Sequence, residues 1–134
     1  MSVVCIRGAI TVEKNDKEEI YNASYRMIKE IIERNNLNID DIISVIFTAT
    51  KDLDQAYPAV SARKLGIVDA SLMCVQELYV EGSLNMVIRA SLMAESSLKQ
   101  KEVRHVYLER AAVLRPVSYT HLNLLIESQF KNWR

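Results

Sequence analysis

One stretch of this chain has the repeat of an amphipathic helix, and the other long apolar runs have the pattern of strands. After Asp16, apolar residues recur at spacings of three and four up to about Asn36, which predicts one long helix with a single buried stripe. Asp16 suits the N-cap, and Glu19 three positions later completes a capping box. A single helix with one apolar stripe buries it by packing on a sheet, so the predicted fold class is α+β.

Five runs are predicted as strands, over residues 2–12, 42–50, 70–80, 84–95 and 103–108. Shorter signals predict a helical turn at about 39–42, a short helix from Pro58 to Gly66, and a chain reversal at Glu81-Gly82-Ser83. One long helix covers about one face of a five-stranded sheet, and the apolar residues of the other face also need cover. Self-association provides it, most economically as a closed ring in which sheets face one another.

Composition limits the classes of function. With 134 residues, 49% of them hydrophobic, we expect one well-packed domain. Seventeen basic and seventeen acidic residues cancel, which argues against a nucleic-acid partner. No apolar run approaches the length of about 20 residues that spans a membrane, and MSVVCIRG lacks the pattern of a signal peptide. We therefore expect a cytoplasmic protein with Cys5 and Cys74 reduced, one buried disulfide being the alternative.

The end of the chain differs from the rest. From Val117 to Arg134 there is no glycine and no clear strand partner, and Phe130 and Trp133 have the pattern of exposed residues. We assign residues 1–116 to the domain and 117–134 to a C-terminal tail. Three interpretations of the tail stay open: a mobile flap, a helix packed on a neighbour, or an unrelated extension.

Three arginines interrupt runs that otherwise have the pattern of buried strands: Arg7, Arg89 and Arg115. A guanidinium cannot lose its charge, so it is seldom buried without a partner. Its planar fork matches a carboxylate with two parallel hydrogen bonds. The leading interpretation is a site for a small polycarboxylate, although Arg7 alone is equally consistent with an edge-strand residue paired with an acid such as Glu13.

Common catalytic motifs are missing from the sequence. Three glycines cannot build a phosphate loop or a dinucleotide fingerprint, and no Gly-x-Ser-x-Gly elbow exists. His105 and His121 have no partners at metal-ligand spacing, so we expect neither metal nor cofactor. A nucleophilic pair of Cys74 and His105 is a minor alternative, because a cysteine in an apolar strand is usually a small hydrophobe.

Four segments resemble one known family: IRGAITVE at 6–13, TATKDLDQAYPAVSARKLG at 48–66, CVQE at 74–77 and HVYLERAAVLRP at 105–116. Together they are similar to the monofunctional chorismate mutases that form homotrimeric pseudo-α/β barrels, a class distinct from the all-helical one. The resemblance covers about residues 3–116. It implies a mixed five-stranded sheet and a cofactor-free Claisen rearrangement of chorismate to prephenate, on the branch to phenylalanine and tyrosine.

The resemblance also implies roles for four catalytic residues. Arg89 is similar to the arginine that donates to the ether oxygen of the substrate. Arg7 resembles the partner of a substrate carboxylate, and Tyr107 a hydroxyl that binds the same end. Glu77 resembles the carboxylate that accepts from the ring hydroxyl and faces the positive ring.

Further binding residues follow from the same resemblance. Cys74 resembles a neighbouring contact to the ring hydroxyl, and Arg115 an arginine at the entrance. The residues similar to those supplied by the adjacent subunit are Tyr57, Ala59 and Arg63. Three sites would then lie in the clefts between the subunits of a homotrimer.

Two departures from the family pattern are visible. Val60 stands where lysine is frequent, which should weaken long-range attraction of a dianion. The tail after Pro116 lacks the usual RPDL-type ending. These departures keep one rival function open, a trimer that binds an anionic metabolite without turnover. An imine or enamine deaminase of similar fold is a second rival, although the motifs of this chain match the mutases instead.

One geometric difficulty yields a prediction of its own. Cys74 and Glu77 have opposite parity on a regular strand, yet both should reach the ligand. We expect a bulge or a strand end at residues 75–78.

Overall fold

The computed structural model describes residues 1–115, so the predicted tail at 117–134 lies outside the described residues. Five strands and two α-helices make up the fold, joined by three short 3₁₀ helices. The strands are β1 (Ser2–Thr11), β2 (Ile42–Ala49), β3 (Ser71–Gln76), β4 (Val87–Ser96) and β5 (Val106–Leu108). The helices are α1 (Lys17–Arg34), α2 (Ala59–Lys64), η1 (Ile39–Asp41), η2 (Gln100–Glu102) and η3 (Glu109–Leu114).

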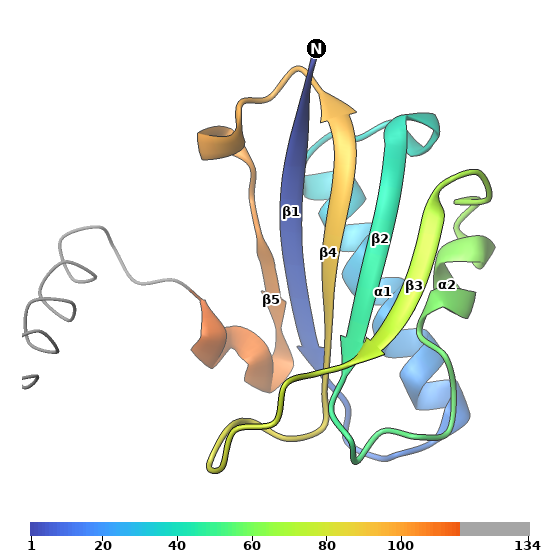
Figure 1. The fold of residues 1–134 in the computed structure, drawn as a ribbon, viewed down its shortest axis with the longest axis vertical. Helices are drawn as coiled ribbons and strands as arrows, with labels where there is room; N and C mark the ends of the chain where they lie inside the picture. The colour runs from blue at the N-terminus through green and yellow to red at the C-terminus, as the bar shows by residue number, and fades with distance from the viewer. Residues whose placement is uncertain (116–134) are drawn as a thin grey trace, which may run out of the picture.

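The strands form one mixed sheet in the order β3-β2-β4-β1-β5 (Figure 1). The central strand β4 runs antiparallel to both β2 and β1. The two edge strands run parallel to their neighbours, β3 to β2 and β5 to β1. The predicted α+β class with a five-stranded mixed sheet is confirmed.

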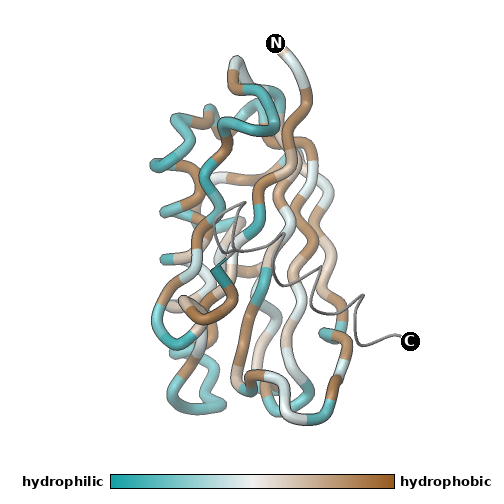
Figure 2. The backbone as a smooth tube through the Cα atoms, turned by 90° about the vertical axis from the view of Figure 1, so that its left-hand side faces the viewer, coloured by the Kyte–Doolittle hydropathy of each residue, from teal (hydrophilic) through white to brown (hydrophobic). Residues whose placement is uncertain are grey.

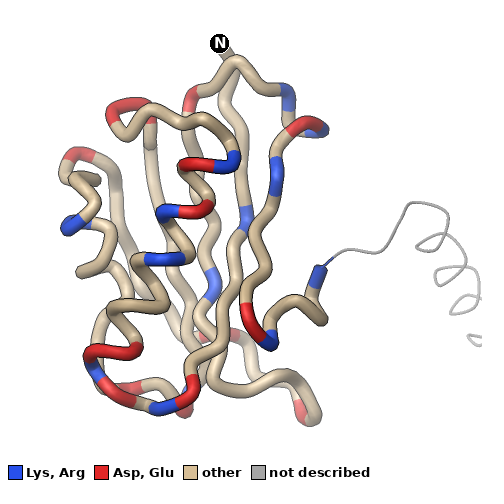
Figure 3. Tube along the Cα trace, turned by 180° about the vertical axis from the view of Figure 1, so that it is seen from behind, with Lys and Arg blue, Asp and Glu red and all other residues tan. Residues whose placement is uncertain are grey.

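One face of the sheet is covered by α1, with α2 beside it, and the other carries no α-helix of the described residues (Figures 1 and 2). At one end of that other face, Ala111 of η3 packs on Ala9 and Tyr107. The even-numbered residues of β1 point to the helix, and Val4, Ile6 and Ile10 are at most 2% exposed. Gly8 makes the contact close, because a Cβ there would lie 2.7 Å from Cδ1 of Ile31. The charged residues of α1 lie on its outer side (Figure 3), as the amphipathic repeat predicts.

The start of α1 shows a modified cap. Asp16 accepts the backbone N–H groups of Glu18 and Glu19 at 3.1 and 3.2 Å. The carboxylate of Glu19 accepts the N–H of Lys14 at 3.0 Å instead of that of Asp16. The N-cap prediction is confirmed. The predicted capping box was wrong in its second bond, because Glu19 accepts from the N–H two residues before the N-cap.

The strands after residue 70 are shorter than predicted, and β3 is followed by an arm, residues 77–86, that projects beyond the sheet (Figure 1). Gly82 turns the arm with φ of 80°, and Met86 has φ of 56°. A left-handed residue cannot continue a ladder, so β4 begins only at Val87. The Met86 N–H donates to Oδ2 of Asp52 at 3.0 Å, which holds the end of the arm.

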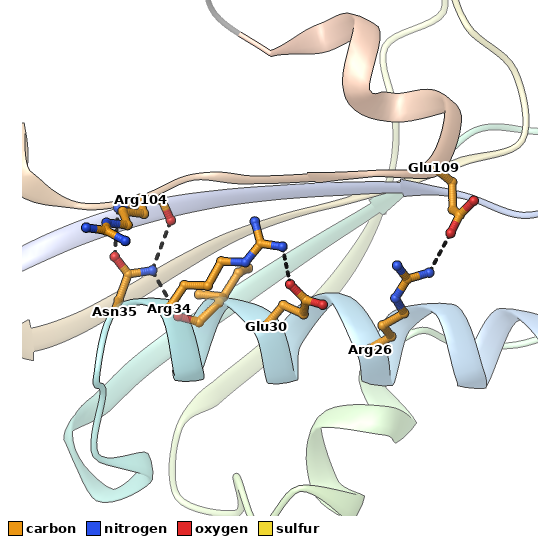
Figure 4. Close-up of polar contacts among 7 residues, drawn as sticks. Arg26, Glu30, Arg34, Asn35, Arg104 and Glu109 are labelled. Carbon is orange, nitrogen blue, oxygen red and sulfur yellow. Dashed lines mark hydrogen bonds and ion pairs between the residues drawn. The ribbon is translucent and has the colours of Figure 1, made fainter.

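A polar clamp joins the end of α1 to the chain that leads into β5 (Figure 4). Asn35 is 2% exposed, and its amide both accepts from the N–H of Arg104 at 2.7 Å and donates to the Arg104 carbonyl at 2.9 Å. Beyond β5, Arg26 pairs with Glu109 at 2.6 Å. The short strand is thus held at one end by Asn35, the C-cap of α1, and at the other by the pair of Arg26 on α1 with Glu109 on η3.

The side of the sheet opposite α1, the open face, carries apolar residues in contact with solvent. They include Val3, Ile46, Met73, Val75 and Met93, between 36% and 54% exposed. Both cysteines are free thiols, so the disulfide alternative was wrong. No helix within residues 1–115 is both long enough and apolar enough to cross a lipid bilayer.

Candidate active site

A single row of residues crosses the open face and gathers most of the predicted site. Thr48 of β2 is the register partner of Arg89 on β4, and Arg89 is the partner of Ala9 on β1. Ala9 is in turn the partner of Tyr107 on β5. Residues paired in register point to the same face, so the row places Arg89 and Tyr107 on either side of a small residue.

Glu77 lies just beyond the end of β3 and turns toward this row. Its Oε1 is 3.6 Å from Nη1 of Arg89, and its Oε2 accepts the hydroxyl of Thr48. The side chains of Arg89 and Glu77 are only 36% and 23% exposed, which limits screening of their charges by water. Arg89 therefore presents a half-buried guanidinium beside a carboxylate whose orientation is fixed.

A cavity of about 320 Å³, the Arg89 cavity, opens beside this pair. Besides Glu77 and Arg89, its wall includes Leu78, Tyr79 and Leu84 of the arm. The wall is mostly apolar with a few convergent charges, an arrangement common in small-molecule sites.

The three arginines that guided the sequence prediction are less buried than expected within one chain. Arg7 is exposed, Arg89 is half-buried, and Arg115 is exposed. Arg7 and Arg89 occupy strand positions that face away from α1, and the described residues leave both side chains accessible to solvent. Arg115 follows the 3₁₀ helix η3 instead of lying in a strand. The prediction of inward-pointing guanidiniums was therefore wrong for an isolated chain.

Arg7 lies on the open face near the β5 edge of the sheet. Its backbone N–H donates to Nδ1 of His105 at 2.9 Å. Partial burial, and secondarily the charge of Arg7, lower the pKa of His105 below its ordinary value of 6.5. A shallow hollow beside His105, the basic hollow, is also lined by Arg34, Arg104, Tyr107 and Arg115. The predicted site residues Arg7, Tyr107 and Arg115 thus meet at one edge.

A different hollow, the Tyr57 hollow, holds two other predicted residues. Tyr57 is 73% exposed there, and Cys74 lines the same hollow. Ala59 and Arg63 are on α2, which begins directly after Pro58. These residues lie toward the β3 edge, at the opposite side of the sheet from Arg7, Tyr107 and Arg115.

Cys74 and Glu77 keep opposite orientations. The β2–β3 ladder is regular from Ser71 to Gln76, and the strand ends there. The expected irregularity at 75–78 is therefore a strand end and not a bulge. Cys74 packs on the helix-covered core, whereas Glu77 faces the open side. Within one chain, Cys74 lies with Tyr57 and not with Glu77.

The nucleophilic alternative fails on the same topology. Cys74 is on edge strand β3 and His105 precedes the opposite edge strand β5, with three strands between them. A proton cannot pass directly between the two side chains across that separation.

Thr48 and Asp52 were missed by sequence reasoning. Thr48 holds Glu77, and Asp52 holds the return of the arm at Met86. The parity of β2 places Thr48 on the same face as Ile46, and a hydroxyl among apolar strand residues was the available signal. Nothing in the sequence pairs Asp52 with Met86, 34 positions away.

Comparison with known proteins identifies the family. The family model described as chorismate mutase type I matches residues 3–117 of the chain. The chain belongs to the chorismate mutase type I family. The chorismate mutase AroH of Bacillus subtilis (strain 168) is 38% identical over 117 residues, which cover 87% of this chain and 92% of the relative.

Two further chorismate mutases agree with the assignment. The AroH enzyme of Thermus thermophilus is 41% identical over 112 residues, covering 83% of this chain and 92% of that enzyme. A solved chorismate mutase from Clostridium thermocellum superposes with a TM-score of 0.80 at 46% identity, covering 81% of this chain and 97% of that one. The protein is therefore an isomerase with chorismate mutase activity, and chorismate is its substrate.

Proposed function

We propose that this chorismate mutase works as a homotrimer, with each site assembled from the open face of one subunit and the α2 region of the next. The observation that supports it most directly is the Arg89–Glu77 pair at the Arg89 cavity, on the sheet face opposite α1. The Tyr57 hollow and the basic hollow lie toward opposite edges of that sheet. A neighbouring subunit can bring the two edges together.

The first demand of the reaction is conformational. The flexible enolpyruvyl ether of chorismate must be folded over the ring before carbon–carbon bond formation and carbon–oxygen cleavage can occur together. Arg7 supplies a guanidinium for a substrate carboxylate. Tyr107 is 5% exposed and packs against Ala9, so its ring is rigid and its hydroxyl can orient the same carboxylate. Both residues hold the substrate in a reactive conformer.

The second demand is electrostatic. As the carbon–oxygen bond breaks, the ether oxygen becomes negative and the ring positive. Arg89 donates to the ether oxygen, and Glu77 accepts from the ring hydroxyl and faces the developing positive charge. Thr48 fixes the Glu77 carboxylate, so the charges need little reorganisation during the reaction.

The adjacent subunit completes the site in this proposal. Tyr57 provides an aromatic wall, Arg63 a second cation, and Ala59 the space between them. Cys74 contacts the ring hydroxyl of the substrate, and Arg115 lies at the entrance to the site. Because Cys74 shares the Tyr57 hollow, we place it with the residues of the adjacent subunit.

Trimer formation would also cover the exposed apolar residues of the open face. We place the enzyme in the cytoplasm, on the branch to phenylalanine and tyrosine.

The test is chorismate consumption by purified protein, followed in the ultraviolet, with prephenate confirmed by acid conversion to phenylpyruvate. Arg89→Ala should lower kcat by about a thousandfold, because the lost donor acts mainly in the transition state. Arg89→Lys keeps the charge without the planar fork and should recover only part of the rate. An Arg89→Ala variant that raises KM alone would sink the assigned role and point to simple binding.

A further inference from the structure

We propose that His105 is a positioning residue for the reaction: its Nδ1 accepts the backbone N–H of Arg7 and holds that arginine on the open face. The inference rests on the proposed role of Arg7 in binding a substrate carboxylate. His105 itself need not touch the substrate.

The edge of β1 shows why such a contact is needed. Strand β5 pairs only with Gly8, Ala9 and Ile10, so among residues 1–115 the preceding half of β1 has no strand neighbour on that side. Side chains take over its hydrogen bonds. The amide of Gln100 accepts from the N–H of Cys5 at 2.8 Å and donates to the Cys5 carbonyl at 2.7 Å.

The next outward N–H along this edge belongs to Arg7, and His105 accepts it at 2.9 Å. Without that acceptor, no described residue would pair with this N–H, and water would replace a fixed partner. An imidazole anchored in the fold holds a backbone group far more tightly than mobile water does. The β1–β4 ladder holds Arg7 on one side, opposite Ser91, and His105 is the described partner of its backbone on the other side.

His105 is itself well anchored. The preceding residue, Arg104, is clamped through its backbone to the buried side chain of Asn35 (Figure 4). Two residues later, Tyr107 is held by the β1–β5 ladder. His105 thus connects the Asn35 clamp to both proposed carboxylate-binding residues, Arg7 and Tyr107.

The contact also requires a defined protonation state. Nδ1 can accept only when it carries no hydrogen, so His105 must be the neutral tautomer with its proton on Nε2. The basic hollow surrounds it with Arg34 of α1, Arg104 before β5, Tyr107 of β5 and Arg115 after η3, and Arg7 of β1 faces it. Glu102 lines the adjoining hollow with Arg34 and Arg104. Partial burial first, and the charge of Arg7 second, lower the pKa of His105 and so favour the neutral imidazole.

The experiment is a double-mutant cycle in the full-length enzyme. His105→Leu removes the acceptor, and His105→Asn keeps an oxygen acceptor near the position of Nδ1 without a titrating group. We expect His105→Leu to raise KM for chorismate about five- to tenfold, the effect of one lost hydrogen bond, with kcat changed by less than about twofold. His105→Asn should stay within about twofold of the parent in both constants. In Arg7→Ala, which raises KM by itself, adding His105→Leu should raise KM no further.

A second readout keeps the test valid if His105→Leu folds poorly. Nitrogen NMR of the histidine ring should show an unprotonated Nδ1 at pH 7, and the KM of the parent should rise on acidification with the same midpoint as the His105 ring signals. That midpoint lies below 6.5 because the imidazolium is disfavoured, and His105→Asn should lack the rise.

Two sets of results would overturn the inference: a folded His105→Leu with an unchanged KM, or KM effects of His105→Leu and Arg7→Ala that simply multiply. Protonated Nδ1 at pH 7 would do the same. If Arg7→Ala leaves KM unchanged, the proposed role of Arg7 fails first, and the two failures are therefore distinguishable.

Discussion

The two faces of the sheet divide stability from catalysis. The face under α1 is closed within one chain, and Val45, Phe47, Ile88 and Leu92 are all 0% exposed there. The open face has Arg89, Glu77 and Arg7 among apolar residues that remain in contact with solvent. Adjacent residues of one strand therefore have different roles, one in the stability of the fold and the other in assembly or catalysis. Substitutions at neighbouring positions can measure the two roles separately.

Neighbours Phe47 and Ile46 give the sharpest test. Phe47→Ala leaves a cavity in the closed core and should lower the free energy of unfolding by about 3–5 kcal/mol. Ile46→Ala, at a residue 42% exposed, should cost less than about 1 kcal/mol. Urea denaturation of both variants at low protein concentration measures the difference, and equal losses would mean that the two faces are equally important for the fold.

A charged residue introduced on the open face should weaken the association of subunits. Ile46→Asp places an unpaired carboxylate in the proposed subunit interface, so we expect dissociation and a loss of activity of about tenfold or more at low concentration. Tyr25→Asp, on α1 and 37% exposed, is the matched control and should leave both unchanged. Sedimentation equilibrium reports the mass, and an Ile46→Asp protein that remains trimeric would rule out this face as the interface.

The Asn35 clamp links the end of α1, which covers the closed face, to Arg104, which precedes His105. Asn35→Ala leaves the backbone groups of Arg104 without their partner, so we expect a loss of about 1–3 kcal/mol in the free energy of unfolding. KM should also rise, because Arg104 precedes His105. Asn38→Ala removes an exposed cap of η1 and should leave KM unaltered; a parallel rise of KM in that control would show that any destabilisation has the same effect.

The smallest effect concerns long-range attraction. Val60→Lys adds a positive charge on α2 and should raise kcat/KM about two- to fivefold at low ionic strength, with the gain disappearing near 0.5 M salt, because screening removes such attraction. The control is Val60→Gln, because glutamine is a long side chain like lysine but carries no charge. It should show no salt-dependent gain in kcat/KM. A gain that persists at high salt would indicate direct contact with the substrate.

The periodicity of apolar residues predicted those elements whose ends depend on local sequence. The stripe of α1 and the alternation of β1 set both elements within two residues of their observed ends, because each is specified by its own side chains. The ends of β3, β4 and β5 were wrong because distant residues decide them. Asp52 holds Met86 in a left-handed conformation, and Gln100 and His105 replace strand pairing before β5.

The site was predictable in its residue types more than in its arrangement. Arg89 and Glu77 lie together as expected. Cys74 lies on the other face, as its parity on a regular strand indicates, because the ladder continues without a bulge to Gln76. Thr48 was missed, and His105 was considered only as a metal ligand or a partner of Cys74, because sheet register and chain crossing bring Glu77 to Thr48 and Arg7 to His105.

The arm has a consequence for engineering. Leu78, Tyr79 and Leu84 form part of the wall of the Arg89 cavity, yet none of them belongs to the sheet or to α1. Both ends of the arm are anchored, by the N–H of Glu77 on the carbonyl of Ala49 at 3.0 Å and by Asp52 on Met86. A loop of different length or composition could be grafted between these two anchors to resize the pocket, while the scaffold that carries Arg89 stays as it is.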